Sequence, residues 1–361
     1  MILVVDPNIS LVKISMVNTK NNCEEIFSEV LNMDQFDGKV NFRAVMKRIC
    51  KNKKVKAISF RAVFGGDVFK TTTKVTPYFM EKLRKLTGSF PLYIPTLGKV
   101  IKNFYDFFRG INMFVFFETT FFSKLPDEEK CYAIPVELSK NNSFKRYGFH
   151  GIFHEDNAEL VSLKSKLVSI VFDSKTTVCS ALGQKPYSIS LGYTPLEGIM
   201  SASSCGDLDS GIVFYLMKRY GNSLFKIDDI LKRQSGFYGL TGYDIKIQEL
   251  IKLYGKDDKV TLAFDVYRNQ ILKYLGEAIS VLGGIDHLVI SGSETKTFFP
   301  IICKLLKDIS FLGINPKCLP WEEDGVFVEL TTHESDIKVS INYQTLAEII
   351  AHKTIKTIKS K

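Results

Sequence analysis

The chain has 361 residues, 45% of them hydrophobic and 24% charged, which is the composition of a folded globular protein and a length that suits two domains. No apolar run reaches the roughly 18 residues of a membrane-spanning helix, and the first residues lack the basic stretch of a secretory signal, so we expect a cytoplasmic protein that does not bind membranes. The net charge of +9 comes from scattered lysines instead of one basic helix, which argues against a nucleic-acid partner.

In the first half of the chain, strand patterns alternate with helix patterns. Residues 2–6 and 12–17 alternate around a polar turn and predict a hairpin. After it we expect, in chain order, a helix at 42–50, a strand at 57–63, a helix at 76–86 and a strand at 113–117. Glu118 follows the last of these strands, at the kind of strand end where catalytic groups often lie.

The second half repeats this plan. A second hairpin is expected from residues 167–172 and 176–181, with helices at 209–220 and 266–282 and a strand at 287–290. Two halves that each begin with a hairpin and continue with strands and helices predict a duplicated α/β unit.

The cysteines give little information about function. There are seven of them, an odd number without a CxxC motif, which predicts reduced thiols instead of disulfides or a metal cluster. Cys205 falls inside a motif described below, where we expect it to be a small side chain without a chemical role.

Two motifs carry the clearest functional signal. RYGFHG spans residues 146–151 and is followed by His154, and GYTPLEG spans residues 192–198 and runs on through Gly206 and Asp207. Together with RAVFGGD at residues 61–67, they resemble the signatures of the acetate and propionate kinases, and the resemblance covers most of the chain.

This resemblance implies the actin-like ATPase fold, an α/β fold with two similar domains around a nucleotide cleft. The first domain is then expected at residues 1–117 plus 345–361, and the second at residues 118–344, with the last helix returning to the first domain. The implied reaction moves a phosphoryl group between ATP and a short-chain carboxylate with Mg²⁺, and the family also implies a homodimer formed through the second domain.

The resemblance assigns catalytic roles to three side chains and marks one replacement. Arg61 matches the arginine that holds the carboxylate or the moving phosphoryl group, a task suited to two parallel hydrogen bonds from a permanent cation. Glu118 stands in the place of an aspartate that positions Mg²⁺, and His150 matches the histidine that stabilises the transition state. Ser204 replaces the second catalytic arginine.

The remaining site positions also follow from the resemblance. An apolar wall for the substrate is expected from Val63, Phe149 and Pro195, and such a wall separates acetate from propionate only weakly. Asp6 and Glu118 are the candidate metal ligands. The expected nucleotide contacts are Lys175, Asp244, Ile245, Lys246, Ser291 and Gly292.

Several family positions are changed, which bears on activity. Asp6 replaces an asparagine, and residues 171–175 (VFDSK) lack the glycines of the second phosphate loop, so that the backbone approaches phosphate less easily. Loss of a positioned arginine, as at Ser204, costs on the order of three to five decades in rate. The chain is therefore expected to be a kinase of reduced activity, or alternatively an inactive paralogue retained to bind a nucleotide, a carboxylate or a partner.

Overall fold

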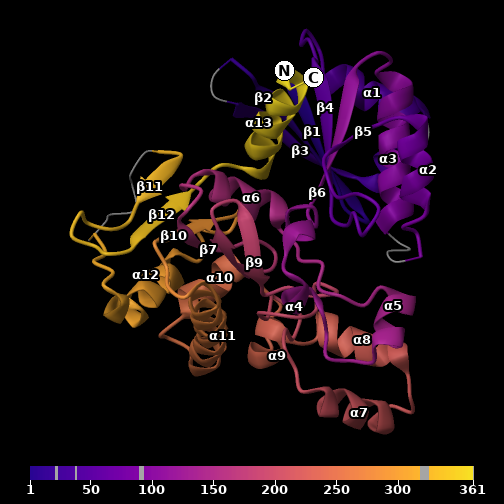
Figure 1. Ribbon diagram of the computed structural model, residues 1–361. Coiled ribbons are helices and arrows are strands. Elements are labelled where there is room, and N and C mark those ends of the chain that lie inside the picture. The colour runs from indigo at the N-terminus through magenta and orange to yellow at the C-terminus, as the bar shows by residue number, and fades with distance from the viewer. Residues whose placement is uncertain (21–22, 37–38, 89–92, 318–324, 361) are drawn as a thin grey trace. The chain divides into compact units, whose positions relative to one another are not determined.

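A computed structural model describes residues 1–20, 23–36, 39–88, 93–317 and 325–360. The chain divides into two compact units, each described here by itself: unit 1 comprises Met1–Ser123 and Thr345–Lys361, and unit 2 comprises Lys124–Gln344 (Figure 1). Within the described ranges, no helix has both the length and the apolar character needed to cross a membrane.

Unit 1 is built on a six-stranded sheet with the order β3-β2-β1-β4-β6-β5. Strands β1, β4 and β6 run parallel, whereas β2, β3 and β5 pair in the antiparallel sense. The strands are β1 (Ile2–Pro7), β2 (Leu11–Asn18), β3 (Glu24–Asn32), β4 (Ala57–Ala62), β5 (Thr73–Lys74) and β6 (Asn112–Phe117). Because β1, β4 and β6 are parallel, their carboxyl ends meet at one edge of the sheet.

Helices cover both faces of this sheet. Ser59 on β4 is hydrogen-bonded to Thr354 of the last helix, and the next residue, Phe60, packs edge-on against Phe104 of α3. Since neighbouring residues of a strand point to opposite faces, the last helix and α3 lie on opposite sides. The helices are α1 (Lys39–Ile49), α2 (Pro77–Arg84), α3 (Tyr93–Phe107) and α13 (Leu346–Lys359), with 3₁₀ turns η1 (Met33–Phe36) and η2 (Phe121–Lys124).

Unit 2 repeats the same sheet. Its six strands have the order β11-β12-β10-β7-β8-β9, in which β7, β10 and β12 are parallel and the other pairs antiparallel. The strands are β7 (Lys166–Val171), β8 (Thr177–Leu182), β9 (Lys185–Ile189), β10 (His287–Ser291), β11 (Phe327–Glu329) and β12 (Lys338–Asn342). Strand order and direction therefore match those of unit 1 strand for strand, and the predicted duplication is confirmed.

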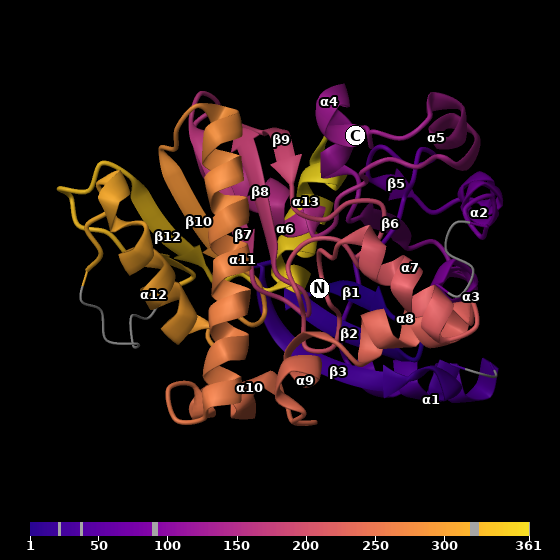
Figure 2. The same ribbon diagram turned by 90° about the horizontal axis from the view of Figure 1, so that it is seen from below.

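Long α11 covers one face of this second sheet and α6 covers the other (Figure 2). Val168 and Ile170 of β7 join the apolar core with α11 residues such as Tyr267 and Ile271, whereas Ser169 between them points toward α6. The helices are α4 (Asp127–Lys130), α5 (Val136–Asn142), α6 (Gly151–Glu159), α7 (Ser210–Arg219), α8 (Leu224–Arg233), α9 (Gly236–Thr241), α10 (Ile247–Leu250), α11 (Asp258–Leu282) and α12 (Phe299–Asp308), with 3₁₀ turns η3 (Ile251–Leu253) and η4 (Ser310–Leu312).

The predicted elements all occur, with shifted ends. The helix expected at 266–282 is the second part of α11, which begins at Asp258 because Asp257 caps it. Thr76 and Asp209, which were expected inside helices, are the caps of α2 and α7. The described cysteines are free thiols, at Cys23, Cys50, Cys131, Cys179, Cys205 and Cys303; Cys318 lies outside the described residues.

Candidate active site

In unit 1, three charged side chains meet at the carboxyl edge of the parallel strands. Arg61 donates through Nε to Glu118 Oε1 at 2.6 Å and through Nη1 to Asp6 Oδ1 at 3.1 Å. The strand register explains this meeting, since β4 lies between β1 and β6 and the backbone N–H of Glu118 donates to Ala62 at 2.9 Å. The structure thus brings together the two expected metal ligands and the expected substrate arginine.

The loop after β4 is fixed by two further hydrogen bonds. The Val63 N–H donates to the Tyr93 hydroxyl at 3.0 Å, and the Gly65 N–H donates to Thr119 Oγ1 at 3.0 Å. A Cβ at Gly65 would lie 2.8 Å from the Phe69 carbonyl oxygen, so the loop requires glycine there. Val63 is partly exposed and directly follows the strand that carries Arg61.

The charges around Arg61 do not balance. Burial by itself lowers the pKa of Arg61, but the Asp6 and Glu118 carboxylates outweigh it and raise this pKa well above the ordinary value. Glu118 is almost fully buried, while Asp6 keeps about a quarter of its side chain exposed. Two carboxylates against one guanidinium make this edge less attractive to an anion than arginine alone would be.

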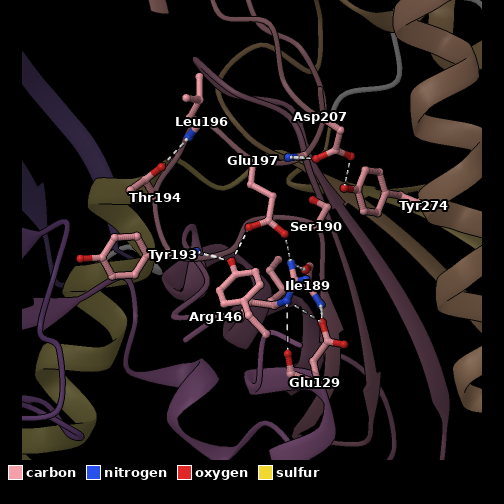
Figure 3. Close-up of polar contacts among 12 residues, drawn as sticks. Glu129, Arg146, Ile189, Ser190, Tyr193, Thr194, Leu196, Glu197, Asp207 and Tyr274 are labelled. Atoms are coloured by element: carbon pink, nitrogen blue, oxygen red, sulfur yellow. Dashed lines mark hydrogen bonds and ion pairs between the residues drawn. The ribbon is translucent and has the colours of Figure 1, made fainter. Parts of the chain in front are cut away.

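In unit 2, an ion pair joins the two motifs. Arg146, the first residue of RYGFHG, places Nη1 2.8 Å from Oε1 of Glu197 in GYTPLEG (Figure 3). Its Nε lies 3.4 Å from Glu129 Oε1, and the Tyr132 hydroxyl donates a short hydrogen bond to Glu197. Burial alone lowers the pKa of Arg146, yet the Glu197 and Glu129 carboxylates raise it above its usual range.

Gly192 opens the second motif at a position where a larger residue would displace two neighbouring side chains. A Cβ at this position would lie 1.7 Å from Glu197 Oε2 and 2.0 Å from the Tyr132 hydroxyl. At the other end of the motif, the Gly198 N–H donates to Asp207 Oδ1 at 2.7 Å, and Tyr274 of α11 donates to the other oxygen of the same carboxylate (Figure 3). Asp207 therefore closes the loop that GYTPLEG begins.

His150 occupies a left-handed backbone conformation, with φ of 59°, immediately before α6. Its side chain is buried, and its Nδ1 lies 3.2 Å from Thr177 Oγ1 on β8. Phe149 beside it is also buried. A left-handed non-glycine residue is uncommon and strained, so the fold specifies this position of His150 closely.

Lys175 and Ser204 are engaged within unit 2. Lys175 Nζ is buried and donates to the carbonyl oxygens of Pro195 and, at 3.2 Å, of Leu196. The Ser204 Oγ lies 2.7 Å from Ser201 Oγ, in a closed turn where the family resemblance has an arginine. Pro195 itself is exposed.

The expected nucleotide residues divide into two groups. Asp244, Ile245 and Lys246 are exposed in the loop before α10. Ser291 is fully buried at the end of β10, where its Oγ accepts from Asn157 Nδ2 at 2.8 Å, so its side chain belongs to the interior. The nucleotide contacts expected of Lys175, Gly292 and these residues stay predictions.

A surface cavity of about 520 Å³ in unit 1 holds none of the expected site residues. Its lining includes Tyr105, Arg109 and Asn112, and Asn112 is the first residue of β6. It thus lies at the opposite end of that strand from Glu118.

Sequence reasoning missed the polar residues that support the site. Tyr93 binds the backbone of Val63, and Thr177 binds the ring of His150. Asn157 binds the side chain of Ser291. None belongs to a recognised motif. The one available signal was the buried-strand pattern around Thr177, in which a polar residue requires a partner.

Known proteins of similar sequence and structure share this architecture. An acetate kinase of Sulfurimonas denitrificans is 30% identical over 266 residues, which are 72% of this chain and 67% of that protein. The crystal structure of Porphyromonas gingivalis acetate kinase superposes with a TM-score of 0.90 at 22% identity over 99% of each chain. That of a propionate kinase from Francisella tularensis gives 0.86 at 22% identity over 98% of each.

The structural matches show that the fold is the two-domain actin-like ATPase fold of acetate kinase, as predicted. In sequence, residues 2–346 match the profile of the Acetokinase family. The chain therefore belongs to the acetokinase family.

Proposed function

We propose that this protein transfers a phosphoryl group between ATP and a short-chain carboxylate, acetate or propionate, at a reduced rate. The observation that carries the proposal is Arg61, fixed between Asp6 and Glu118 at the carboxyl edge of the parallel strands. Its Nη2 makes no hydrogen bond with the described residues, which leaves N–H groups for a carboxylate or phosphoryl oxygen.

The chemistry asks mainly for position and charge. Phosphoryl transfer spreads negative charge over the equatorial oxygens, so a fixed cation and a fixed hydrogen-bond donor lower the barrier. Arg61 would supply the cation and His150 the donor. The apolar side chains of Val63, Phe149 and Pro195 are the proposed contacts of the substrate's alkyl group, and one methylene changes such binding by only about 1–3 kcal/mol.

The family implies Mg²⁺, and the residues present fit a metal ion held mainly by phosphates and water. No group of three or more His, Cys, Asp or Glu residues in the described part of the chain forms a metal cage, whereas Mg²⁺ bound with a nucleotide needs only one or two carboxylates. Asp6 fits this role better than Glu118 because it is partly exposed, and an asparagine in its place would keep an oxygen for the ion without the negative charge that opposes phosphate. When bound, the ion would neutralise phosphate charge.

An inactive paralogue is the second candidate, favoured by Ser204. Its hydroxyl is hydrogen-bonded to Ser201, and a serine supplies no cation. The amine of Lys175 donates hydrogen bonds to backbone carbonyls. In this alternative the protein would bind a nucleotide, a carboxylate or a partner without turnover.

The test is acyl phosphate formation, trapped with hydroxylamine, from acetate or propionate with ATP and Mg²⁺. We expect turnover well below the typical value of about 10 per second, abolished by Arg61→Gln, which removes the cation and leaves a shorter, neutral polar side chain. Arg48→Gln, at an exposed arginine of the same unit paired with Glu29, is the matched control. Equal rates for the wild type and Arg61→Gln would contradict the proposed role of Arg61, and ATP binding without any product would favour the inactive paralogue.

We also propose that the protein forms a homodimer through α7 and α8. No side chain of α7 is buried, and Phe214 and Tyr215 on it are 69% and 60% exposed. On α8, Leu224 and Phe225 are 71% and 80% exposed. A clustered apolar surface of this kind typically marks an interface, and most soluble oligomers are symmetric assemblies of identical chains.

A further inference from the structure

A chain of hydrogen bonds crosses the interior of unit 2 and reaches His150. It begins at Gln344, whose backbone N–H donates to Asn342 Oδ1 at 3.1 Å. The Asn342 Nδ2 then donates to Asp156 Oδ2 at 2.9 Å and to Asn157 Oδ1 at 3.2 Å. Two different acceptors thus face the same amide nitrogen.

From Asn157 the chain continues through β7 and α6. Asn157 Nδ2 donates to Ser169 Oγ at 2.8 Å, and Ser169 Oγ lies 2.8 Å from His154 Nδ1. His154 Nε2 lies 2.8 Å from Thr177 Oγ1, which lies 3.2 Å from His150 Nδ1. These side chains are all buried, so water does not replace a missing partner.

The first link sets the direction of the next two. A backbone N–H can only donate, so Asn342 presents its oxygen to Gln344 and its NH₂ group to Asn157. Asn157 therefore accepts with its oxygen and donates with its nitrogen to Ser169. The assignment of both amides follows from this backbone donor.

The hydrogen bonds of Ser169 fix which nitrogen of His154 is protonated. Its oxygen accepts from Asn157, and the one other hydrogen-bond partner of this hydroxyl among the described residues is His154 Nδ1. If the histidine donated instead, the buried Ser169 hydroxyl proton would have no acceptor, which is unfavourable. Ser169 therefore donates to Nδ1, and the proton of the neutral His154 ring is on Nε2.

The ionisation of His154 agrees with this arrangement. Burial lowers the pKa of His154 well below its ordinary value, and the nearby His150 adds a smaller effect in the same direction. The ring is therefore neutral near pH 7 and has one donor and one acceptor nitrogen. Its Nε2–H donates to Thr177, whose hydroxyl then donates to Nδ1 of His150.

We propose that His154 is a positioning residue that, through Thr177, fixes the tautomer of His150, so that the neutral form of its ring carries its proton on Nε2. This deepens the proposed function and rests on it in one respect: a proton on Nε2 makes that nitrogen the hydrogen-bond donor for a phosphoryl oxygen. The tautomer itself does not depend on turnover.

The test is a long-range ¹H–¹⁵N correlation spectrum of the uniformly ¹⁵N-labelled full chain, recorded under conditions in which the histidines are neutral. The chain has five histidines, and the signals of His150 are identified by their loss in His150→Gln. We expect a bare Nδ1 and a protonated Nε2. A protonated Nδ1 in the wild type would overturn the proposal without any variant.

Two variants test the role of His154. Thr177→Val removes the hydroxyl at nearly constant shape, and His154→Phe removes both ring nitrogens; in each we expect His150 to lose its single-tautomer pattern and give averaged signals. Thr177→Ser should restore the pattern. Ser180→Ala, at a buried serine on the same strand bonded to Ser188, is the matched control and should leave it unchanged.

A single Nε2–H pattern that survives in folded His154→Phe would show that His154 has no positioning role. The predicted spectrum together with no acyl phosphate formation would contradict the proposed function alone. The two proposals therefore fail by different results.

Discussion

Arg146 and Glu197 form the ion pair that holds the two motifs of unit 2 together, with 2.8 Å between Nη1 and Oε1. Both side chains are mostly shielded, at 20% and 28% exposure. Around them, Glu129 and Tyr132 complete the network, and burial raises the pKa of the Glu129 carboxyl. A cation at position 146 thus offsets two neighbouring carboxylates that would otherwise repel each other.

Arg146→Met should lower the free energy of unfolding by about 2 kcal/mol or more, because it leaves partly buried carboxylates without their cation. The measurement is a urea titration followed by circular dichroism. Lys252→Met removes the cation of an exposed pair with Glu249 and should change the value by less than about 0.5 kcal/mol. Equal losses in the two variants would mean that the Arg146 network does not stabilise unit 2.

Asp6→Asn should strengthen binding of ATP with Mg²⁺ or raise acyl phosphate formation, by roughly tenfold. The substitution removes a negative charge 3.1 Å from Arg61, and a unit charge at such a distance is worth about 1–4 kcal/mol near a protein surface. Calorimetry and the hydroxamate assay measure the two effects. Asp106→Asn, at an exposed aspartate on α3, should change neither. Weaker binding in Asp6→Asn would instead show that the metal ion needs the negative charge of Asp6.

Ser204→Arg alone should raise the rate of acyl phosphate formation by less than about tenfold. The effects on rate of groups that act together in catalysis are non-additive. This variant still has the changed phosphate loop at residues 171–175, and it still has Asp6 in place of asparagine. Combining it with Asp6→Asn should give a larger gain than the product of the single gains. Full recovery by the single substitution would show that the other changes are neutral.

The pH dependence of stability should reveal the lowered pKa of Lys175. Burial, opposed by Cys205, Asp207 and Glu197, lowers the pKa of Lys175 from its ordinary 10.5 to about 8. Above pH 8 the folded chain has lost this proton while the unfolded chain still binds it, so the contribution to stability rises with pH up to the ordinary pKa.

Relative to Lys175→Met, the wild type should therefore gain up to about 1.4 kcal/mol of unfolding free energy per pH unit within this window. Urea titrations in a Cys205→Ser background measure it without the thiol that faces the amine. Lys246→Met, at an exposed lysine, is the comparison. A difference that stays constant with pH would show that the buried amine keeps its proton.

Phe225→Glu should convert the proposed dimer to a monomer, because it places a charge in an apolar contact. Phe311→Glu is a closely matched control, since Phe311 is 81% exposed and Phe225 80%, and it lies on η4 instead of α8. Sedimentation equilibrium of both variants and the wild type measures the mass. A monomeric wild type would contradict the proposed dimer.

The plan of the fold could be predicted from the sequence because the chain repeats it. Hairpins with alternating residues and short apolar runs mark β1, β2, β7 and β8 by local pattern alone. Strand β3 was missed because it lies at the edge of its sheet and is largely exposed, so that it lacks an alternating apolar pattern. The two-residue β5 is too short to have a pattern.

The candidate site was predictable only in part. Arg61 and Glu118 were recognised in motifs at strand ends, and their direct contact follows from parallel pairing. The chain of hydrogen bonds to His150 was beyond sequence reasoning because its partners are distant in the chain: Asn342 and Asp156 are 186 positions apart, and Asn157 and Ser291 are 134 apart. Ordinary serine, threonine and asparagine carry no local mark of such contacts.

The position of α13 has a consequence for the order in which the protein is made. Residues 345–361 complete unit 1, where Ile349 and Ile350 are buried and Thr354 contacts Ser59 of β4, yet they follow all of unit 2 in the chain. During translation, the N-terminal strands emerge first, among them β1, β2 and β4. The face of their sheet that α13 covers stays exposed until residues 124–344 have been translated. Unit 2, which is continuous, can fold earlier, so the N-terminal sheet is the part of the nascent chain most exposed to aggregation and most dependent on protection during synthesis.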